Sequence, residues 1–165
     1  MPILPKTLLE HLDAGYNLAR WLTRNDNDAK DILQEAFLRA LKYSDSFRGN
    51  HHRAWFLKIV RNTAYTWLKN KSLFIAFDEE IAEIENDPPT PETYLLKSAE
   101  ATFVGKALES MAVEFREILI LREMEDLSYE EISQTLDIPI GTVMSRLSRA
   151  RKQIAILLKD QRSQK

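Results

Sequence analysis

The chain has 165 residues, of which 44% are hydrophobic and 29% charged, and it contains no cysteine. These values fit one or two compact domains, and they exclude a disulfide framework, a thiolate metal site and a cysteine nucleophile. No apolar run near the start is long enough for a signal peptide or a membrane span, so we expect a cytoplasmic protein.

The formal net charge of −2 averages over segments of opposite sign. Residues 1–77 carry 12 Lys and Arg against 7 Asp and Glu, and residues 141–165 carry 7 against 1. Residues 78–100 carry 1 against 8, and residues 101–140 carry 3 against 9. Because Lys and Arg act locally on phosphates, the two basic segments allow polyanion binding despite the acidic total.

Apolar residues recur at helical spacing along nearly the whole chain, which contains only 4 glycines. This pattern predicts an all-α fold. Residues 77–91 combine an acidic run with three prolines, which cannot continue a helix. We therefore predict two small helical domains, residues 1–76 and 101–165, joined by an acidic, proline-containing linker over residues 77–100.

In the first domain, a helix is predicted from an apolar stripe that forms its buried face: Ala29, Ile32, Leu33, Ala36, Phe37, Ala40 and Leu41. The outward side carries Asp28, Asp31, Gln34, Glu35 and Leu38. Spacing alone favours an ordinary solvated face, and a docking surface for a basic partner helix stays open. A magnesium site is disfavoured, because carboxylates along one helix do not converge on an ion.

The next predicted helix, residues 53–69, has two contrasting faces. Its apolar face comprises Phe56, Ile59, Val60, Thr63, Ala64 and Trp67. The opposite face carries Lys58, Arg61, Asn62, Tyr65 and Lys69, a mixture that suits unpaired nucleic acid. Solvated cations above a tryptophan-containing core remain an equal alternative. The polar stretch 44–52 before this helix predicts a loop, and its adjacent His51 and His52 do not favour a metal site.

The second domain contains the most specific local signal. Ser128 and Glu131 have the spacing of a capping box, which predicts the start of a short helix. Residues 137–141 end that helix, and Thr142 is expected to cap a second one. The exposed side of the second helix carries Met144, Ser145, Arg146, Ser148, Arg149, Arg151 and Lys152. This spacing is typical of a helix-turn-helix, with a basic helical hairpin of no DNA-binding role as the alternative.

Five motifs follow one another along the chain: residues 28–41 (DAKDILQEAFLRAL), 47–49 (FRG), 55–64 (WFLKIVRNTA), 127–132 (LSYEEI) and 141–151 (GTVMSRLSRAR). In this order they resemble the extracytoplasmic-function (ECF) sigma factors, two-domain members of the bacterial sigma-70 family. The resemblance extends from about residue 9 to about residue 158. It implies a promoter-recognition subunit of RNA polymerase, with no catalytic chemistry, cofactor or metal of its own.

The resemblance also implies a role for each surface. Asp28, Asp31, Gln34, Glu35 and Leu38 would dock on the clamp helices of the largest polymerase subunit. An apolar hairpin, Phe115 and Ile118 to Leu121, would partly face the flap of the second-largest subunit. An anti-sigma partner is expected, because many family members are held inactive by one.

DNA contacts would fall on both domains. The loop at residues 44–52, with Arg48 and Asn50, would hold a flipped minus-ten base, and the strip from Lys58 to Lys69 would follow the non-template strand. The helix from Thr142 would read the minus-thirty-five element. Two departures from the family weaken these expectations: Met144 stands where the family usually has a basic residue, and Thr66 stands where it often has Asp.

Other hypotheses compete with this interpretation. A helix-turn-helix activator or repressor would explain residues 128–158, but residues 1–77 resemble neither a ligand-binding nor a dimerisation domain. A magnesium-dependent nuclease using Asp26, Asp28, Asp31 and Glu35 is the least favoured. A regulatory hypothesis is that the acidic residues Asp78, Glu79, Glu80 and Glu83 shield the basic faces of the free protein.

Overall fold

The computed structural model describes residues 5–77 and 99–163, and every regular element in these two ranges is helical. The first range forms α1 (Pro5–Leu9), α2 (Leu12–Thr23), α3 (Asp26–Lys42), a 3-10 turn (Ser44–Ser46) and α4 (His52–Phe77). The second forms α6 (Ala99–Ser110), α7 (Val113–Leu119), a π-helical turn (Ile120–Met124), α8 (Tyr129–Leu136) and α9 (Ile140–Ser163). The predicted all-α fold is confirmed. Among the described helices, none combines the length and apolarity needed to cross a membrane.

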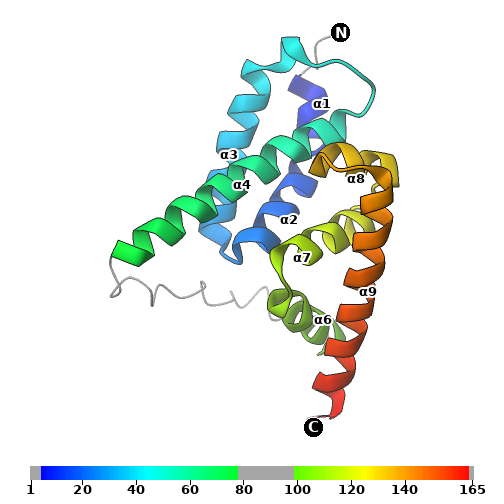
Figure 1. Ribbon diagram of the computed structural model, residues 1–165. Helices are drawn as coiled ribbons and strands as arrows, with labels where there is room; N and C mark the ends of the chain where they lie inside the picture. The colour runs from blue at the N-terminus through cyan, green and yellow to red at the C-terminus, as the bar shows by residue number, and fades with distance from the viewer. Residues whose placement is uncertain (1–4, 78–98, 164–165) are drawn as a thin grey trace.

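Helices α2, α3 and α4 pack against one another to form the first domain (Figure 1). Gly15 of α2 lies where they approach most closely: a Cβ placed there would stand 2.9 Å from both Leu33 Cδ1 and Phe56 Cε2. A larger residue at this position would therefore force Leu33 or Phe56 to shift. Helix α3 begins at an Asn25 cap, whose side chain accepts a 2.8 Å hydrogen bond from the Asp28 amide.

The apolar faces predicted for the first domain form its core. On α3, Ala29, Ile32, Ala36 and Ala40 are buried, and Leu33, Phe37 and Leu41 are partly buried against them. On α4, Phe56, Val60, Thr63 and Ala64 are buried, while Ile59 and Trp67 are partly buried. Helix α4 is longer than the predicted 53–69: it begins at His52 and continues to Phe77.

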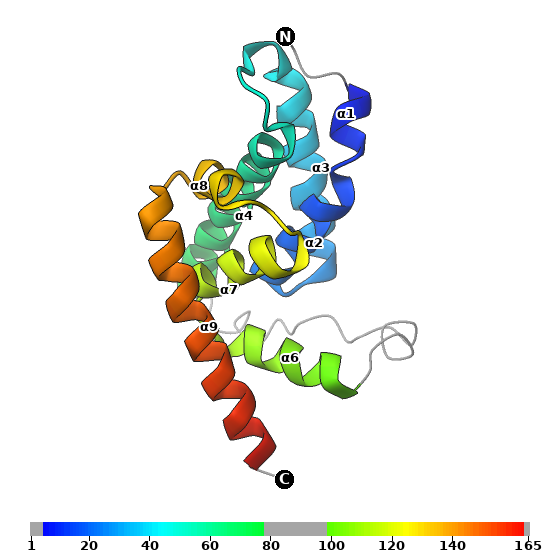
Figure 2. The same ribbon diagram turned by 90° about the vertical axis from the view of Figure 1, so that its right-hand side faces the viewer.

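The second domain is built around α9, which packs against α6, α7 and α8 (Figure 2). The capping box is confirmed: the Glu131 amide donates to Ser128 Oγ, and the Ser128 amide donates to Glu131 Oε1, both at 3.1 Å. The turn after α8 places Asp137 in the left-handed region at φ 56°. Ile132, Leu136, Val143 and Leu147 close the core, which gives α8 and α9 the predicted helix-turn-helix arrangement.

The predicted cap of α9 is wrong. The helix begins at Ile140, and the Val143 amide donates to the Pro139 carbonyl, so Thr142 lies inside the first turn. Pro139 therefore takes the N-cap position, and the fixed φ of proline is tolerated at the start of a helix. Most of the predicted linker, including Asp78, Glu79, Glu80 and Glu83, lies outside the described residues.

Candidate nucleic-acid interface

Helix α4 presents the strip of cations, amide and aromatic that the sequence predicts, but its members differ in exposure. Asn62 and Lys69 are exposed, and Lys58 is half-buried. Arg61 stacks over Tyr65, with the guanidinium carbon 4.3 Å from the ring centroid. One edge of the strip is therefore open to solvent, while the edge with Arg61 and Tyr65 is occupied.

The second domain occupies that edge through Glu117 of α7. Arg61 Nε donates to Glu117 Oε2 at 2.8 Å and Nη2 donates to Oε1 at 3.2 Å. The Glu117 side chain is 0% exposed and that of Arg61 is 22% exposed. The pair is bidentate and largely desolvated, which is the geometry in which an arginine and a carboxylate attract most strongly.

Burial shifts the pKa of all three groups. Desolvation raises the pKa of Glu117 above its ordinary value, although Arg61 opposes the change. Desolvation also raises the pKa of Tyr65, and the charge of Glu117 adds to the effect. For Arg61, burial by itself lowers the pKa, but the hydrogen bond to Glu117 outweighs it and the net change is upward. At neutral pH, Arg61 is charged and Tyr65 is a neutral phenol.

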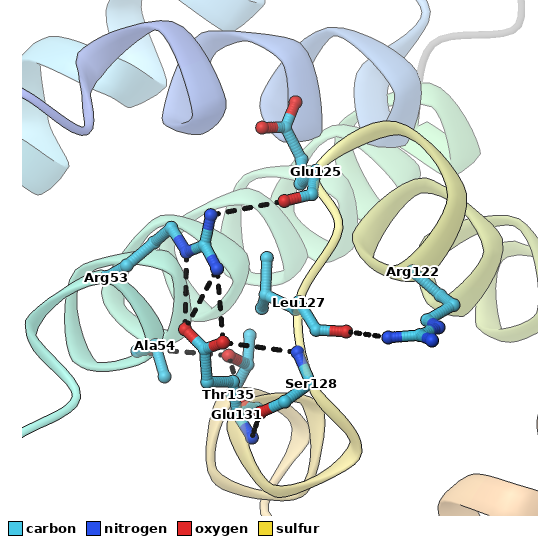
Figure 3. Close-up of polar contacts among 8 residues, drawn as sticks. All are labelled: Arg53, Ala54, Arg122, Glu125, Leu127, Ser128, Glu131 and Thr135. Atoms are coloured by element: carbon cyan, nitrogen blue, oxygen red, sulfur yellow. Dashed lines mark hydrogen bonds and ion pairs between the residues drawn. The ribbon is translucent and has the colours of Figure 1, made fainter.

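A second ion pair joins the domains at the start of α4 (Figure 3). The Arg53 guanidinium contacts both carboxylate oxygens of Glu131 at 3.1 to 3.2 Å, and its Nη1 donates to the Glu125 carbonyl at 3.2 Å. Burial would raise the pKa of Glu131, but its bonds to Ser128 and Arg53 prevail and lower it. Glu131 therefore completes the capping box and holds Arg53 at the same time. Thr135 of α8 also donates to the Ala54 carbonyl at 3.4 Å.

The loop before α4 is anchored by one aromatic residue. Phe47 is buried and packs edge-on to Trp55, with ring centroids 5.3 Å apart. Gly49 has φ 119°, a conformation that a side chain would strain. Within the described residues, the Arg48 side chain bonds to two backbone carbonyls of its own loop, those of Asp45 and Phe47, and both Arg48 and Asn50 are exposed. Arg48 and Asn50 are thus available to a ligand.

The exposed side of α9 has the composition that the sequence predicts. Ser145, Ser148, Arg149 and Lys152 are exposed, Met144 is 54% exposed, and Thr142 and Arg146 are half-buried. Arg151 is engaged with Glu123, 2.8 Å away in the same domain. The first four turns of α9 therefore offer a mainly polar and cationic surface that includes the exposed Met144.

The outward face of α3 is acidic, as predicted, with Leu38 59% exposed among the polar residues. Asp31 and Gln34 are exposed, and Glu35 pairs with Arg39 on the same helix at 2.8 Å. Asp28 is bound by Lys71 of α4 at 3.1 Å. Asp26 accepts a hydrogen bond from Tyr16 and pairs with Lys30. These carboxylates have separate partners, and within the described residues no three His, Asp or Glu form a possible metal site.

The apolar hairpin is mostly core. Ile118, Leu119, Ile120 and Leu121 are buried, and only Phe115 is half-buried. The structure also reveals residues that the sequence interpretation missed: Arg53 lies on α4 two turns before Arg61, and Glu117 directly precedes the buried run Ile118 to Leu121. A carboxylate next to such an apolar run was the available signal, since a buried charge needs a partner.

An all-α protein with a cationic, aromatic strip on one domain and a helix-turn-helix on the other belongs to the class of DNA-binding transcription proteins. Comparison with known families narrows this class. Residues 8–74 match the sigma-70 region 2 family and residues 104–154 match the sigma-70 region 4 family.

Whole-chain relatives agree with these matches. The chain is 31% identical over 156 residues to the ECF RNA polymerase sigma factor SigE of Mycolicibacterium smegmatis. This match covers 93% of the chain but only 61% of that protein. It is 35% identical over 147 residues to the ECF RNA polymerase sigma-E factor of Haemophilus influenzae, covering 83% of this chain and 77% of that protein. The chain belongs to the ECF sigma factors, which are transcription initiation factors and not enzymes.

A solved structure shows the same arrangement of helices. It is the sigma factor RpoE in complex with the anti-sigma factor NepR from Bartonella quintana, with a TM-score of 0.79 and 29% identity. The match covers 93% of this chain and 95% of that one.

Proposed function

We propose that this chain binds core RNA polymerase in the cytoplasm and directs it to particular promoters, with no catalysis of its own. The observation that carries the proposal is the coincidence of two independent features. The region 2 match contains the cationic strip of α4, and the region 4 match contains the helix-turn-helix. We further propose the domain limits predicted from the sequence, residues 1–76 and 101–165 with a linker between them.

The first domain binds the minus-ten element in this proposal. Arg48 and Asn50, exposed on a loop held by Phe47, hold a base flipped out of the duplex. Extracting a base costs a few kcal/mol, which stacking and hydrogen bonds in the pocket must offset. The non-template strand then follows the α4 strip: Lys58, Arg61, Asn62, Tyr65 and Lys69. A cationic helix with an aromatic side chain suits an unpaired strand of this kind.

The second domain binds the minus-thirty-five element by inserting α9 into the major groove. The contacts come from the first four turns of the helix: Thr142, Met144, Ser145, Arg146, Ser148, Arg149 and Lys152. Arginines and lysines there meet phosphates or base edges, whereas Met144 offers an apolar contact suited to a thymine methyl group. We expect Met144→Arg to change the preferred base opposite this residue in a transcription assay, and an unchanged preference would remove Met144 from the contact set.

Core polymerase docks on the outward face of α3. Asp28, Asp31, Gln34, Glu35 and Leu38 form the contact with the clamp helices, and the half-buried Phe115 adds a contact with the flap. Charge pairing across such a surface sets the register and the association rate more than the affinity. Because Asp28 is already held by Lys71 and Glu35 pairs with Arg39, we assign most of the charge contact to Asp31.

Run-off transcription tests the proposal. Purified core RNA polymerase and a library of genomic promoter fragments are incubated with and without the chain, and transcripts are sequenced. We expect promoter-specific transcripts only when the chain is present. Activity that requires a holoenzyme already containing another sigma factor would identify an activator instead, and no specific transcript would exclude both.

A variant pair tests the docking surface. We expect Asp31→Ala with Leu38→Ala to weaken binding to core polymerase by about thirtyfold, since hot-spot residues contribute roughly 1 kcal/mol or more each. The matched control is Glu114→Ala, which removes an exposed carboxylate from the second domain. Equal binding by the pair and the control would overturn the assignment.

An anti-sigma factor is the remaining proposed partner, by analogy with the sigma factor RpoE, whose solved structure contains one. The test is a purified candidate that forms a 1:1 complex with the chain and abolishes the run-off transcripts. Complex formation without inhibition would argue against this role.

A further inference from the structure

Carboxylates of the second domain occupy arginines of the helix that carries the proposed DNA strip. Glu117 holds Arg61 with two hydrogen bonds, and Glu131 holds Arg53 with both oxygens. These contacts link residues 56 and 78 positions apart in the chain. They join the two domains and do not belong to the core of either one.

A nucleic-acid phosphate and the Glu117 carboxylate would compete for the same donors. A guanidinium presents its N–H groups in a planar fork that matches a carboxylate or a phosphate, but the edge that Glu117 engages cannot serve both. Tyr65 is affected as well, because the Arg61 guanidinium covers its ring and a base cannot stack on that face. We call this state, in which Glu117 and Glu131 hold Arg61 and Arg53 across the interface, the closed arrangement. In it, Arg61 and Tyr65 are not available to DNA.

The chemistry of the interface allows it to open. Besides the two ion pairs, its polar contacts include Asn17, which donates to Glu125 Oε1 at 2.8 Å, and Arg24, which donates to the Glu109 carbonyl at 3.3 Å. Apolar side chains of the two domains also pack together, with Trp21 of α2 beside Gly105 of α6, so separation would expose some apolar surface. Water can hydrate the polar groups after separation, which leaves neither charge of the Arg61–Glu117 pair buried without a partner.

We propose that the closed arrangement is an autoinhibited state, in which Glu117 and Glu131 occupy the arginines of α4 until the two domains separate on the polymerase. The inhibition acts through the chain's own second domain. It rests on the proposed function for its transcription readout, but the closure itself can be measured without DNA or polymerase.

The absence of cysteine makes a direct test possible. Asn17→Cys and Glu125→Cys place two thiols across the interface, where a short reducible bis-thiosulfonate reagent can join them. We expect the joined protein to lose run-off transcription and to recover it when the bridge is reduced. The control pair, Glu123→Cys with Arg151→Cys, replaces an exposed ion pair inside the second domain, and joining it should leave transcription unchanged.

The outcomes separate the two proposals. If the joined interdomain protein transcribes as well as the reduced protein, autoinhibition is wrong and the sigma-factor function stands. If the unmodified chain directs no specific transcript, the proposed function fails, and the closure is then judged by binding of the free protein to single-stranded DNA.

The measurement of binding to single-stranded DNA uses charge-matched variants. Glu117→Gln with Glu131→Gln should tighten binding to fluorescein-labelled oligo(dT) by about tenfold, as expected if roughly a tenth of the wild-type protein is open. The control, Glu114→Gln with Glu123→Gln, removes the same charge from exposed positions of the same domain. Equal tightening by both pairs would show general electrostatics and overturn the inference, provided that circular dichroism shows both variants folded.

Discussion

Single residues set how closely the first domain packs. Gly15 allows α2 to contact α3 and α4 because it has no side chain at the point of closest approach. The sequence shows only a glycine inside a helical pattern, where it costs about 1 kcal/mol relative to alanine. The reason for accepting that cost is visible only when the three helices are placed together.

We expect Gly15→Ala to destabilise the protein by about 1–3 kcal/mol, because its Cβ would overlap Leu33 and Phe56. Urea unfolding followed by circular dichroism measures the change. Gly141→Ala is the matched control: its Cβ meets nothing within 4 Å, so a small gain in helix stability is expected. A neutral Gly15→Ala would mean that the neighbouring side chains move aside freely.

A histidine beside the interdomain contact should make stability depend on pH. The pKa of His11 is lowered from 6.5, mainly by burial and then by the charge of Arg53. The folded protein therefore binds a proton less readily than the unfolded chain, so this contribution to stability is complete above about pH 6.5 and is lost as the pH falls through the lowered value.

The test compares urea unfolding at pH 7.5 and 5.5. Wild type should lose more stability between these values than His11→Gln, which has no proton to gain at this position. Equal losses in the two proteins would show that other groups cause the acid sensitivity.

At the scale of single elements, helix caps and turns could be predicted from the sequence, except for the cap of α9. The Ser128–Glu131 capping box needs only four consecutive residues, so its geometry follows from local spacing. The cap of α9 was misplaced by three residues: Pro139 takes the N-cap position in place of Thr142, because its carbonyl accepts the first helical hydrogen bond from the Val143 amide.

Removing the capping box should destabilise the second domain. We expect Ser128→Ala to cost about 1 kcal/mol, since the Glu131 amide loses its acceptor. Ser148→Ala, at an exposed position in the middle of α9, should change the unfolding free energy by less than about 0.5 kcal/mol. Comparable losses for the two serines would mean that the cap contributes nothing.

The cations of α9 should act on DNA largely independently of base sequence. Arg149→Ala and Lys152→Ala are each expected to reduce the slope of log affinity against log salt by about one, measured with duplex promoter DNA. Arg151→Ala serves as the comparison, because Arg151 is engaged by Glu123. An unchanged slope for Arg149 and Lys152 would place them away from the phosphates.

At the scale of the whole molecule, the interdomain ion pairs decide what each domain can bind. Arg61→Ala would leave Glu117 buried without its partner, a cost of about 3–5 kcal/mol if the domains stayed together. Because separation hydrates Glu117, we expect the variant to open instead. Small-angle scattering should show a larger radius of gyration with unchanged helix content.

Arg151→Ala, which breaks an exposed pair inside one domain, is the control for this measurement and should leave the radius unchanged. Loss of helix content in Arg61→Ala would contradict the expectation, since it would mean that the second domain unfolds before it separates.

The sequence by itself determined the helical fold, the two domains' helix phases, the helix-turn-helix and the family, because each is encoded in spacings of a few residues or in contiguous motifs. Only the tertiary structure decided the partners of Arg53 and Arg61. Each arginine lies on a face that periodicity marks simply as polar, and its carboxylate comes from a helix more than 50 residues away. Whether each arginine meets its carboxylate depends on how the two domains pack, and no local sequence pattern specifies that packing.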